Sequence, residues 1–157
     1  MDFEKLFPRY DSKGIETVRS AYAIAEEALK DMEKNHVCFR FFGDLTRLNP
    51  KLRKLCLEAQ ERSKEYHEVQ VNFCLNYGGR DEIIRAMKDY AQDVKDGKAE
   101  VSDLTEELFS SYLDSAGVPD PELVIRPSGE LRLSNFLPWQ TVYSEFVFMN
   151  VLWPDFS

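Results

Sequence analysis

The stretch that decides the fold is residues 119–146, PDPELVIRPSGELRLSNFLPWQTVYSEF. Its short β-branched run at residues 123–125 predicts a buried strand that ends at Arg126. The Pro-Ser-Gly sequence at residues 127–129 cannot comfortably continue such a strand, so a polar loop follows it. In an open α/β sheet, ligands bind beyond the carboxyl ends of the strands. The sequence therefore predicts a ligand-binding loop directly after this strand.

The side chains of this loop indicate the kind of ligand. Guanidinium, hydroxyl and amide groups occur within a few positions of one another, at Arg126, Ser128, Arg132, Ser134 and Asn135. Such groups favour an anion, most naturally a phosphate or a diphosphate. The alternative is that Arg126 and Arg132 pair with nearby carboxylates such as Glu130 and Glu145. Because the chain is acidic overall, with a formal net charge of −8, two arginines in one Ser/Gly/Asn loop favour the anion site.

The remainder of the chain alternates between helical and extended patterns. The predicted elements are a helix over residues 15–32, strands over 37–42 and 69–77, helices beginning at Asn49-Pro50 and at residue 80, a short helix capped by Ser102 or Thr105, and a last strand over 145–152. Buried strands that alternate with helices are typical of the α/β class, with a mostly parallel sheet flanked by helices. The length of 157 residues and the absence of a linker composition predict a single domain over residues 1–157.

A second segment, NYGGRDEI at residues 76–83, follows the predicted strand at 69–77. A strand followed by Gly78-Gly79 and a helix is found in phosphate-binding turns. It is found equally in tight strand–helix packing, and the pattern is neither GxGxxG nor the lysine-containing phosphate loop. Both interpretations remain open on the residues alone.

Composition limits the classes of function. The net charge of −8 and the isoelectric point of about 4.9 argue against a general nucleic-acid binder, which would carry a basic face. Three widely spaced cysteines, Cys38, Cys56 and Cys74, lack metal-site spacing and predict free thiols in a reducing compartment. The sequence shows neither a leader pattern nor an apolar run of membrane-spanning length, so we expect a cytoplasmic protein.

Several segments together resemble one enzyme family, the cis-prenyltransferases of the undecaprenyl diphosphate synthase (isoprenyl transferase) type. The C-terminal signature of that family is matched by IRPSGELRLSNF at 125–136, WQ at 139–140, YSE at 143–145 and WPDF at 153–156. Two further elements are matched by RFFGD at 40–44 and by NYGGRDEI at 76–83. The elements come in the family's order and spacing, and the resemblance covers most of the chain from the first helix onward.

The resemblance implies an activity and a set of site residues. Members of this family condense isopentenyl diphosphate onto an allylic diphosphate, here expected to be farnesyl diphosphate, and make a polyprenyl diphosphate lipid carrier with cis double bonds. Arg126, Arg132 and Ser134 would hold the isopentenyl diphosphate, and the backbone of Leu133 would approach it. Glu145 matches the family's carboxylate ligand to Mg²⁺, an ion that proteins usually bind through one or two carboxylates, waters and phosphate oxygens.

The resemblance also implies partners. One is a second copy of the chain, in a homodimer. The resemblance also implies that the helix over residues 15–32 lines an apolar tunnel for the growing prenyl chain. A lipid product is compatible with peripheral contact between a cytoplasmic protein and a membrane.

The chain departs from the family pattern at both ends. It contains neither the N-terminal Asp-Gly-Asn-Gly-Arg-Trp segment with its Mg²⁺-binding aspartate nor the next strand, and it ends before the family's final helix and basic tail. Pro127 replaces a common threonine. Since proximity and electrostatic stabilisation are the main sources of rate, we expect the 157-residue chain by itself to be inactive or nearly so. The alternatives are a non-catalytic partner subunit, a truncated paralogue, and a generic phosphate-binding α/β domain.

Overall fold

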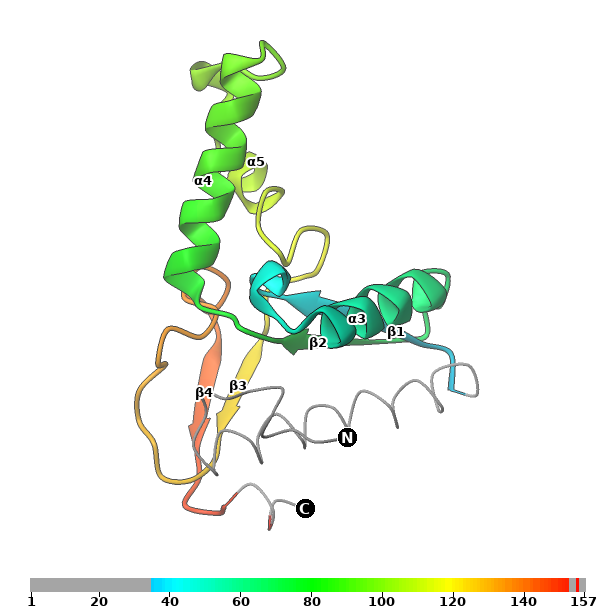
Figure 1. The fold of residues 1–157 in the computed structure, drawn as a ribbon. Helices are drawn as coiled ribbons and strands as arrows, with labels where there is room; N and C mark the ends of the chain where they lie inside the picture. Colours follow the sequence, from blue (N-terminus) through cyan, green and yellow to red (C-terminus); the bar gives the residue numbers. More distant parts are fainter. Residues whose placement is uncertain (1–34, 153–154, 156–157) are drawn as a thin grey trace. The chain divides into compact units, whose positions relative to one another are not determined.

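The computed structural model describes residues 35–152 and residue 155. The chain divides into two compact units, Met1–Asn76 and Tyr77–Ser157. Each unit contains one pair of parallel strands among its described residues (Figure 1). The predicted helix over residues 15–32, and residues 153, 154 and 156 of the WPDF segment, lie outside the described residues.

The first unit is built from two strands and a helix. Strands β1 (Val37–Phe42) and β2 (Val69–Cys74) pair in parallel, with Val37 opposite Val69. Between them run a short 3-10 turn, η1 (Leu45–Arg47), and helix α3 (Pro50–Ser63). As predicted, α3 begins after Asn49, whose side-chain oxygen accepts a hydrogen bond of 2.9 Å from the Lys51 amide.

Helix α3 packs on β1 and satisfies part of its backbone. Ser63, which is fully buried, accepts a hydrogen bond of 2.9 Å from the Phe39 amide, and Gln60 Oε1 accepts one of 3.1 Å from the Phe41 amide. Amides two residues apart lie on the same edge of a strand, so α3 covers one edge of β1. The core of the unit gathers beside this contact, at Phe39, Phe42, Leu52, Cys56 and Ala59.

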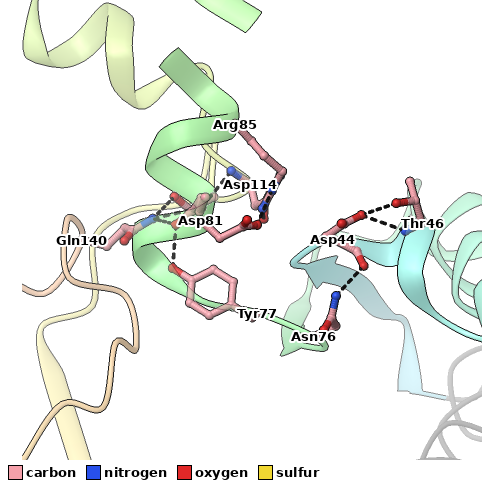
Figure 2. A network of polar contacts seen from close by, with 10 residues as sticks. Asp44, Thr46, Asn76, Tyr77, Asp81, Arg85, Asp114 and Gln140 are labelled. Atoms are coloured by element: carbon pink, nitrogen blue, oxygen red, sulfur yellow. Dashed lines mark hydrogen bonds and ion pairs between the residues drawn. The ribbon is translucent and has the colours of Figure 1, made fainter. Parts of the chain in front are cut away.

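Strand β2 is shorter than the predicted run to residue 77. It ends at Cys74, because Asn76 takes a left-handed conformation with φ of 47°. The Asn76 carbonyl accepts from the Asp44 amide at 3.4 Å, and its side-chain amide donates to the Asp44 carbonyl at 2.9 Å (Figure 2). These bonds join the two loops that follow β1 and β2.

The second unit contains two helices and two strands. Helix α4 (Gly79–Lys95) matches the predicted helix and ends before a turn at Gly97, whose φ is 73°. A 3-10 turn, η2 (Val101–Asp103), leads to the short helix α5 (Glu106–Ser110). Of the two predicted caps, Thr105 is the one observed. Ala86 of α4 packs with Phe109, Leu113 and Trp139 in the core.

Strands β3 (Leu123–Arg126) and β4 (Glu145–Phe148) pair in parallel, with Leu123 opposite Glu145 and Arg126 opposite Phe148 (Figure 1). The strand predicted over residues 123–125 is present, but the prediction that it is buried was wrong, because Leu123 and Ile125 are 49% and 44% exposed. The predicted last strand over 145–152 is shorter than expected. After Phe148, the backbone bonds to the loop that follows β3: the carbonyls of Val151 and Met149 accept from the Ser128 and Gly129 amides, both at 2.8 Å. The loop after β3 is thereby tied to the segment after β4.

The α/β class with parallel strands flanked by helices is confirmed. The prediction of a single domain over residues 1–157 stays a prediction. Among the described residues, Cys38, Cys56 and Cys74 form no disulfide, and Cys56 is buried. Within residues 35–152 and 155, no helix combines the length and the apolar character needed to cross a membrane.

Candidate functional site

The site predicted from the sequence lies at the carboxyl end of β3, in the second unit. Arg126 is the last residue of the strand, and Ser128 and Gly129 then turn the chain with positive φ values of 70° and 68°. A serine in this conformation is uncommon, and here the Ser128 amide donates a hydrogen bond to the Val151 carbonyl that helps to hold it. The turn therefore fixes where the Arg126 side chain leaves the sheet.

Among the described residues, the oxygens that accept hydrogen bonds from the Arg126 guanidinium are neutral. Its Nη1 donates to the Leu133 carbonyl at 3.5 Å and its Nη2 donates to Ser134 Oγ at 3.3 Å. Its Nε is buried and has no hydrogen-bond partner in the described part of the chain. Both bonds are long, and among residues 35–152 and 155 no carboxylate forms an ion pair with Arg126. A buried guanidinium nitrogen without a partner is costly, and an anion would satisfy it.

A groove of about 410 Å³ opens beside this guanidinium. Its polar lining comes from Arg126, Ser128, Glu130 and Arg132, and its apolar lining includes Leu133 and Phe136. Arg132 Nη1 lies 2.5 Å from Glu130 Oε2 in an ion pair whose arginine side chain is 71% exposed. The alternative of carboxylate pairing thus holds for Arg132 but not for Arg126. Because an exposed pair contributes little, Arg132 is free to exchange Glu130 for a ligand anion.

The structure brings together four of the five predicted site residues. Arg126, Arg132 and Leu133 line the groove, and Ser134 contacts Arg126. Glu145 lies elsewhere: it is the first residue of β4, exposed and opposite Leu123. Three residues of a parallel strand separate it from the Arg126 end, or about 10 Å. Its role as a metal ligand stays a prediction.

The Gly78-Gly79 turn is occupied by the protein's own groups. The Gly79 amide donates to the Asn135 carbonyl at 2.8 Å, and the Arg80 amide donates to Asn135 Oδ1 at 2.9 Å. Amides at the first turn of a helix are the donors that a phosphate would need. Their bonds to Asn135 favour the interpretation as strand–helix packing over the interpretation as a phosphate turn.

One buried carboxylate had no role in the sequence-based prediction. Glu82, on the first turn of α4, is 1% exposed, and its carboxylate accepts hydrogen bonds from three groups. They are the Tyr77 hydroxyl at 2.6 Å, the Asp114 amide at 2.9 Å and the Gln140 side-chain amide at 3.2 Å (Figure 2). All three neighbours donate, which suits a carboxylate that can only accept. Glu82 therefore ties the NYGGRDEI segment to the WQ segment.

The same part of α4 holds a fork-like ion pair. Arg85 donates from Nη1 and Nη2 to the two Asp114 oxygens at 2.9 and 2.7 Å, and from Nε to Asp81 at 3.1 Å (Figure 2). The hydrogen bond with Asp114 raises the pKa of the Arg85 guanidinium above its ordinary value. Bidentate pairs of this kind fix geometry as well as adding energy. Asp114 is therefore held at two points, at its carboxylate by Arg85 and at its amide by Glu82.

Comparisons with known proteins show which family the chain resembles. Residues 10–157 match the protein-family model described as "Putative undecaprenyl diphosphate synthase". An isoprenyl transferase of Clostridium perfringens is 46% identical over 129 residues, which is 82% of this chain and 51% of that protein. The chain thus spans about half the length of the curated relatives it matches.

Two solved structures share the fold. The lavandulyl diphosphate synthase of Lavandula x intermedia, in complex with dimethylallyl diphosphate, has a TM-score of 0.86 and 28% identity, covering 95% of this chain and 65% of that one. A structure titled "probable undecaprenyl diphosphate synthase" from Campylobacter jejuni has a TM-score of 0.80 and 35% identity, covering 98% of this chain and 69% of that one.

Proposed function

Because this chain belongs to the undecaprenyl diphosphate synthase family of cis-prenyltransferases, we propose that it binds the diphosphate of isopentenyl diphosphate in the groove beside Arg126. The reaction served is the condensation of that five-carbon unit onto an allylic diphosphate, with farnesyl diphosphate as the expected primer. The observation that carries the proposal is the Arg126 guanidinium, which has a buried Nε without a partner and touches no described carboxylate.

Each residue of the groove has a distinct part in holding the diphosphate. Arg126 presents a planar guanidinium that can bind two phosphate oxygens at once. Arg132 adds a second positive charge once it leaves Glu130, and Ser134 supplies a hydroxyl that already points to Arg126. The Leu133 backbone lies within the same set of contacts. Together they bind the building block by its charged end and leave its carbon end for reaction.

The contribution of these residues to rate is placement. A diphosphate fixed by two guanidiniums orients the attached alkene toward the carbon from which the allylic diphosphate departs, and this converts a bimolecular encounter into a nearly unimolecular step. The positive side chains also stabilise negative charge on the bound oxygens throughout the reaction.

Magnesium enters the proposal through Glu145. Its carboxylate is exposed and chemically suited to the ion. Within residues 35–152 and 155, however, no three acidic, histidine or cysteine side chains gather into a metal site. The proposal takes one ligand, Glu145, from the described residues, and the roles given above to Arg126, Arg132 and Ser134 do not depend on the ion.

A homodimer and peripheral contact with a membrane also belong to the proposal. The support for an interface lies just before β4, where the neighbouring Val142 and Tyr143 are 67% and 95% exposed. Apolar side chains clustered on a surface mark contact sites more often than single exposed ones do.

Calorimetric titration of the 157-residue chain with isopentenyl diphosphate tests the proposal directly. We expect Arg126→Ala to weaken binding at least about tenfold, because a hydrogen bond to a charged group contributes about 1.5–3 kcal/mol. Arg126→Lys should recover only part of this loss, since an ammonium cannot bind two oxygens in one plane. The matched control is Lys88→Ala, which removes one positive charge from the exposed face of α4. Equal weakening in both alanine variants would show a general charge effect and would refute the site.

A further inference from the structure

The loop that carries the proposed site has an unusual backbone. Ser134, Asn135 and Leu137 all have left-handed φ values, of 50°, 65° and 45°. A left-handed conformation disfavours residues other than glycine, and asparagine tolerates it best among them. A run of such residues persists only where the surrounding contacts determine it.

The contacts that determine this backbone come from the start of α4. Asn135 accepts two hydrogen bonds there, one at its carbonyl from the Gly79 amide at 2.8 Å and one at its Oδ1 from the Arg80 amide at 2.9 Å. These amides have no partner within the helix itself. Asn135 therefore caps α4 from 55 residues away in the sequence, and the helix end in turn fixes the Asn135 backbone.

The two glycines of the NYGGRDEI segment make room for this contact. A Cβ on Gly79 would lie 1.9 Å from Pro138 Cδ and 3.2 Å from the Asn135 carbonyl. A Cβ on Gly78 would lie 2.9 Å from the Asn135 side-chain nitrogen. Gly78 has a φ of −154°, which other residues also adopt, so the requirement at this position is space and not backbone freedom.

Asn135 adjoins the two groups that contact Arg126. Ser134 Oγ and the Leu133 carbonyl, which accept from the guanidinium, belong to the two residues directly before it. Residues 133–135 therefore contain both the groups that contact Arg126 and the residue that caps α4, a helix of four to five turns.

We propose that Asn135 is a positioning residue for the diphosphate site. Its cap on α4 holds Leu133 and Ser134 where they orient the Arg126 guanidinium toward the groove. The inference rests on the proposed function for the identity of the ligand, but the positioning of Arg126 can be measured without any ligand.

Three variants separate positioning from simple stabilisation. Asn135→Gly removes the side-chain acceptor and keeps the left-handed backbone accessible. Asn135→Asp keeps both the acceptor and a tolerance for the left-handed conformation. Thr105→Ala is the matched control, because it removes the side-chain cap of another helix in the same unit, α5, at a distance in sequence from the loop.

The first measurement is nitrogen-15 relaxation of the ligand-free chain. We expect Asn135→Gly to lower the heteronuclear NOE of the Arg126 Nε–H group and to speed hydrogen exchange at the Arg80 amide, whereas Thr105→Ala changes neither. An Arg126 Nε–H signal as rigid in Asn135→Gly as in the wild type would overturn the inference, whether or not the chain binds a diphosphate.

The second measurement is calorimetric titration with isopentenyl diphosphate. We expect Asn135→Gly to bind at least about tenfold more weakly, a change of about 1.4 kcal/mol, and Asn135→Asp to stay within about threefold of the wild type. Equal affinity of Asn135→Gly and wild type, equal weakening by Thr105→Ala, or failure of Asn135→Asp to restore binding would each overturn the positioning role. A wild-type chain that binds no diphosphate, yet loses Arg126 rigidity in Asn135→Gly, would refute the proposed function and leave the positioning intact.

Discussion

Replacement of the buried Glu82 by alanine gives a quantitative test of how the second unit is held together. The substitution removes the carboxylate oxygen that accepts from the Asp114 amide, and it removes one of the two acceptors of the Gln140 side-chain amide, the other being Ser115 Oγ at 2.9 Å. A buried donor left without a partner costs about 1–3 kcal/mol. The cavity left by a side chain that is 1% exposed adds to this. We therefore expect the free energy of unfolding to fall by about 2–4 kcal/mol, a large share of a typical total of about 5–15 kcal/mol.

Urea unfolding, followed by Trp139 fluorescence in a Trp153→Phe background, measures this change within the second unit. Glu82→Gln should lose only about 1 kcal/mol, because its amide oxygen can still accept from Asp114 while its nitrogen donates to the Tyr77 hydroxyl. Asp89→Ala removes an exposed carboxylate from the same helix and should stay within about 0.5 kcal/mol of the wild type. A loss below about 1 kcal/mol for Glu82→Ala would refute the view that this carboxylate organises the unit.

Two further outcomes are expected in the first unit. Ser63→Ala should lower the free energy of unfolding by about 1–3 kcal/mol, because the Phe39 amide loses its buried acceptor; an unchanged urea midpoint would contradict the contact. Burial raises the pKa of the Cys56 thiol to about 11. Because the folded state favours the protonated thiol, the stability that this thiol contributes should be complete below its unfolded pKa of about 8.5 and be lost as the pH rises through about 11. Iodoacetamide at pH 8 should accordingly label Cys38 before Cys56, as peptide mass spectrometry would show, and equal labelling rates would contradict the burial.

The sequence predicted the elements whose local signals agree with their packing. Asn49 followed by Pro50 marks the start of α3, and the β-branched run at residues 123–125 marks β3, because capping and strand propensity act over a few residues. Strand ends were predicted less well. Strand β2 stops three residues early because Asn76 bonds to Asp44, a contact across 32 positions that no local pattern records.

The role of Glu82 was missed for a related reason. Helix α4 has Ile84 and Met87 about half exposed, while the buried positions are Glu82, Ala86 and Tyr90 at a spacing of four. The signal present in the sequence is the spacing: Glu82 lies four residues before Ala86 and eight before Tyr90, and so on the same face of the helix as both. The carboxylate reads as a polar interruption of an apolar face until the three donors that surround it are known.

The two motifs that identify the family form one structural unit in this protein. The segment at residues 76–83 supplies two amides and a buried carboxylate, and the signature after β3 supplies Asn135 and Gln140, which bind them. These hydrogen bonds lie within the protein, so the two amides and the carboxylate at the α4 end already have partners, although Gln140 Oε1 is buried without a hydrogen-bond partner among the described residues. Arg126 differs, since its Nε is the buried donor without a partner in the same segment. A match to the signature therefore includes residues that build the loop, such as Asn135, and a residue proposed to bind a ligand, Arg126. The unsatisfied donor of a positively charged side chain is the feature that favours the binding role for Arg126.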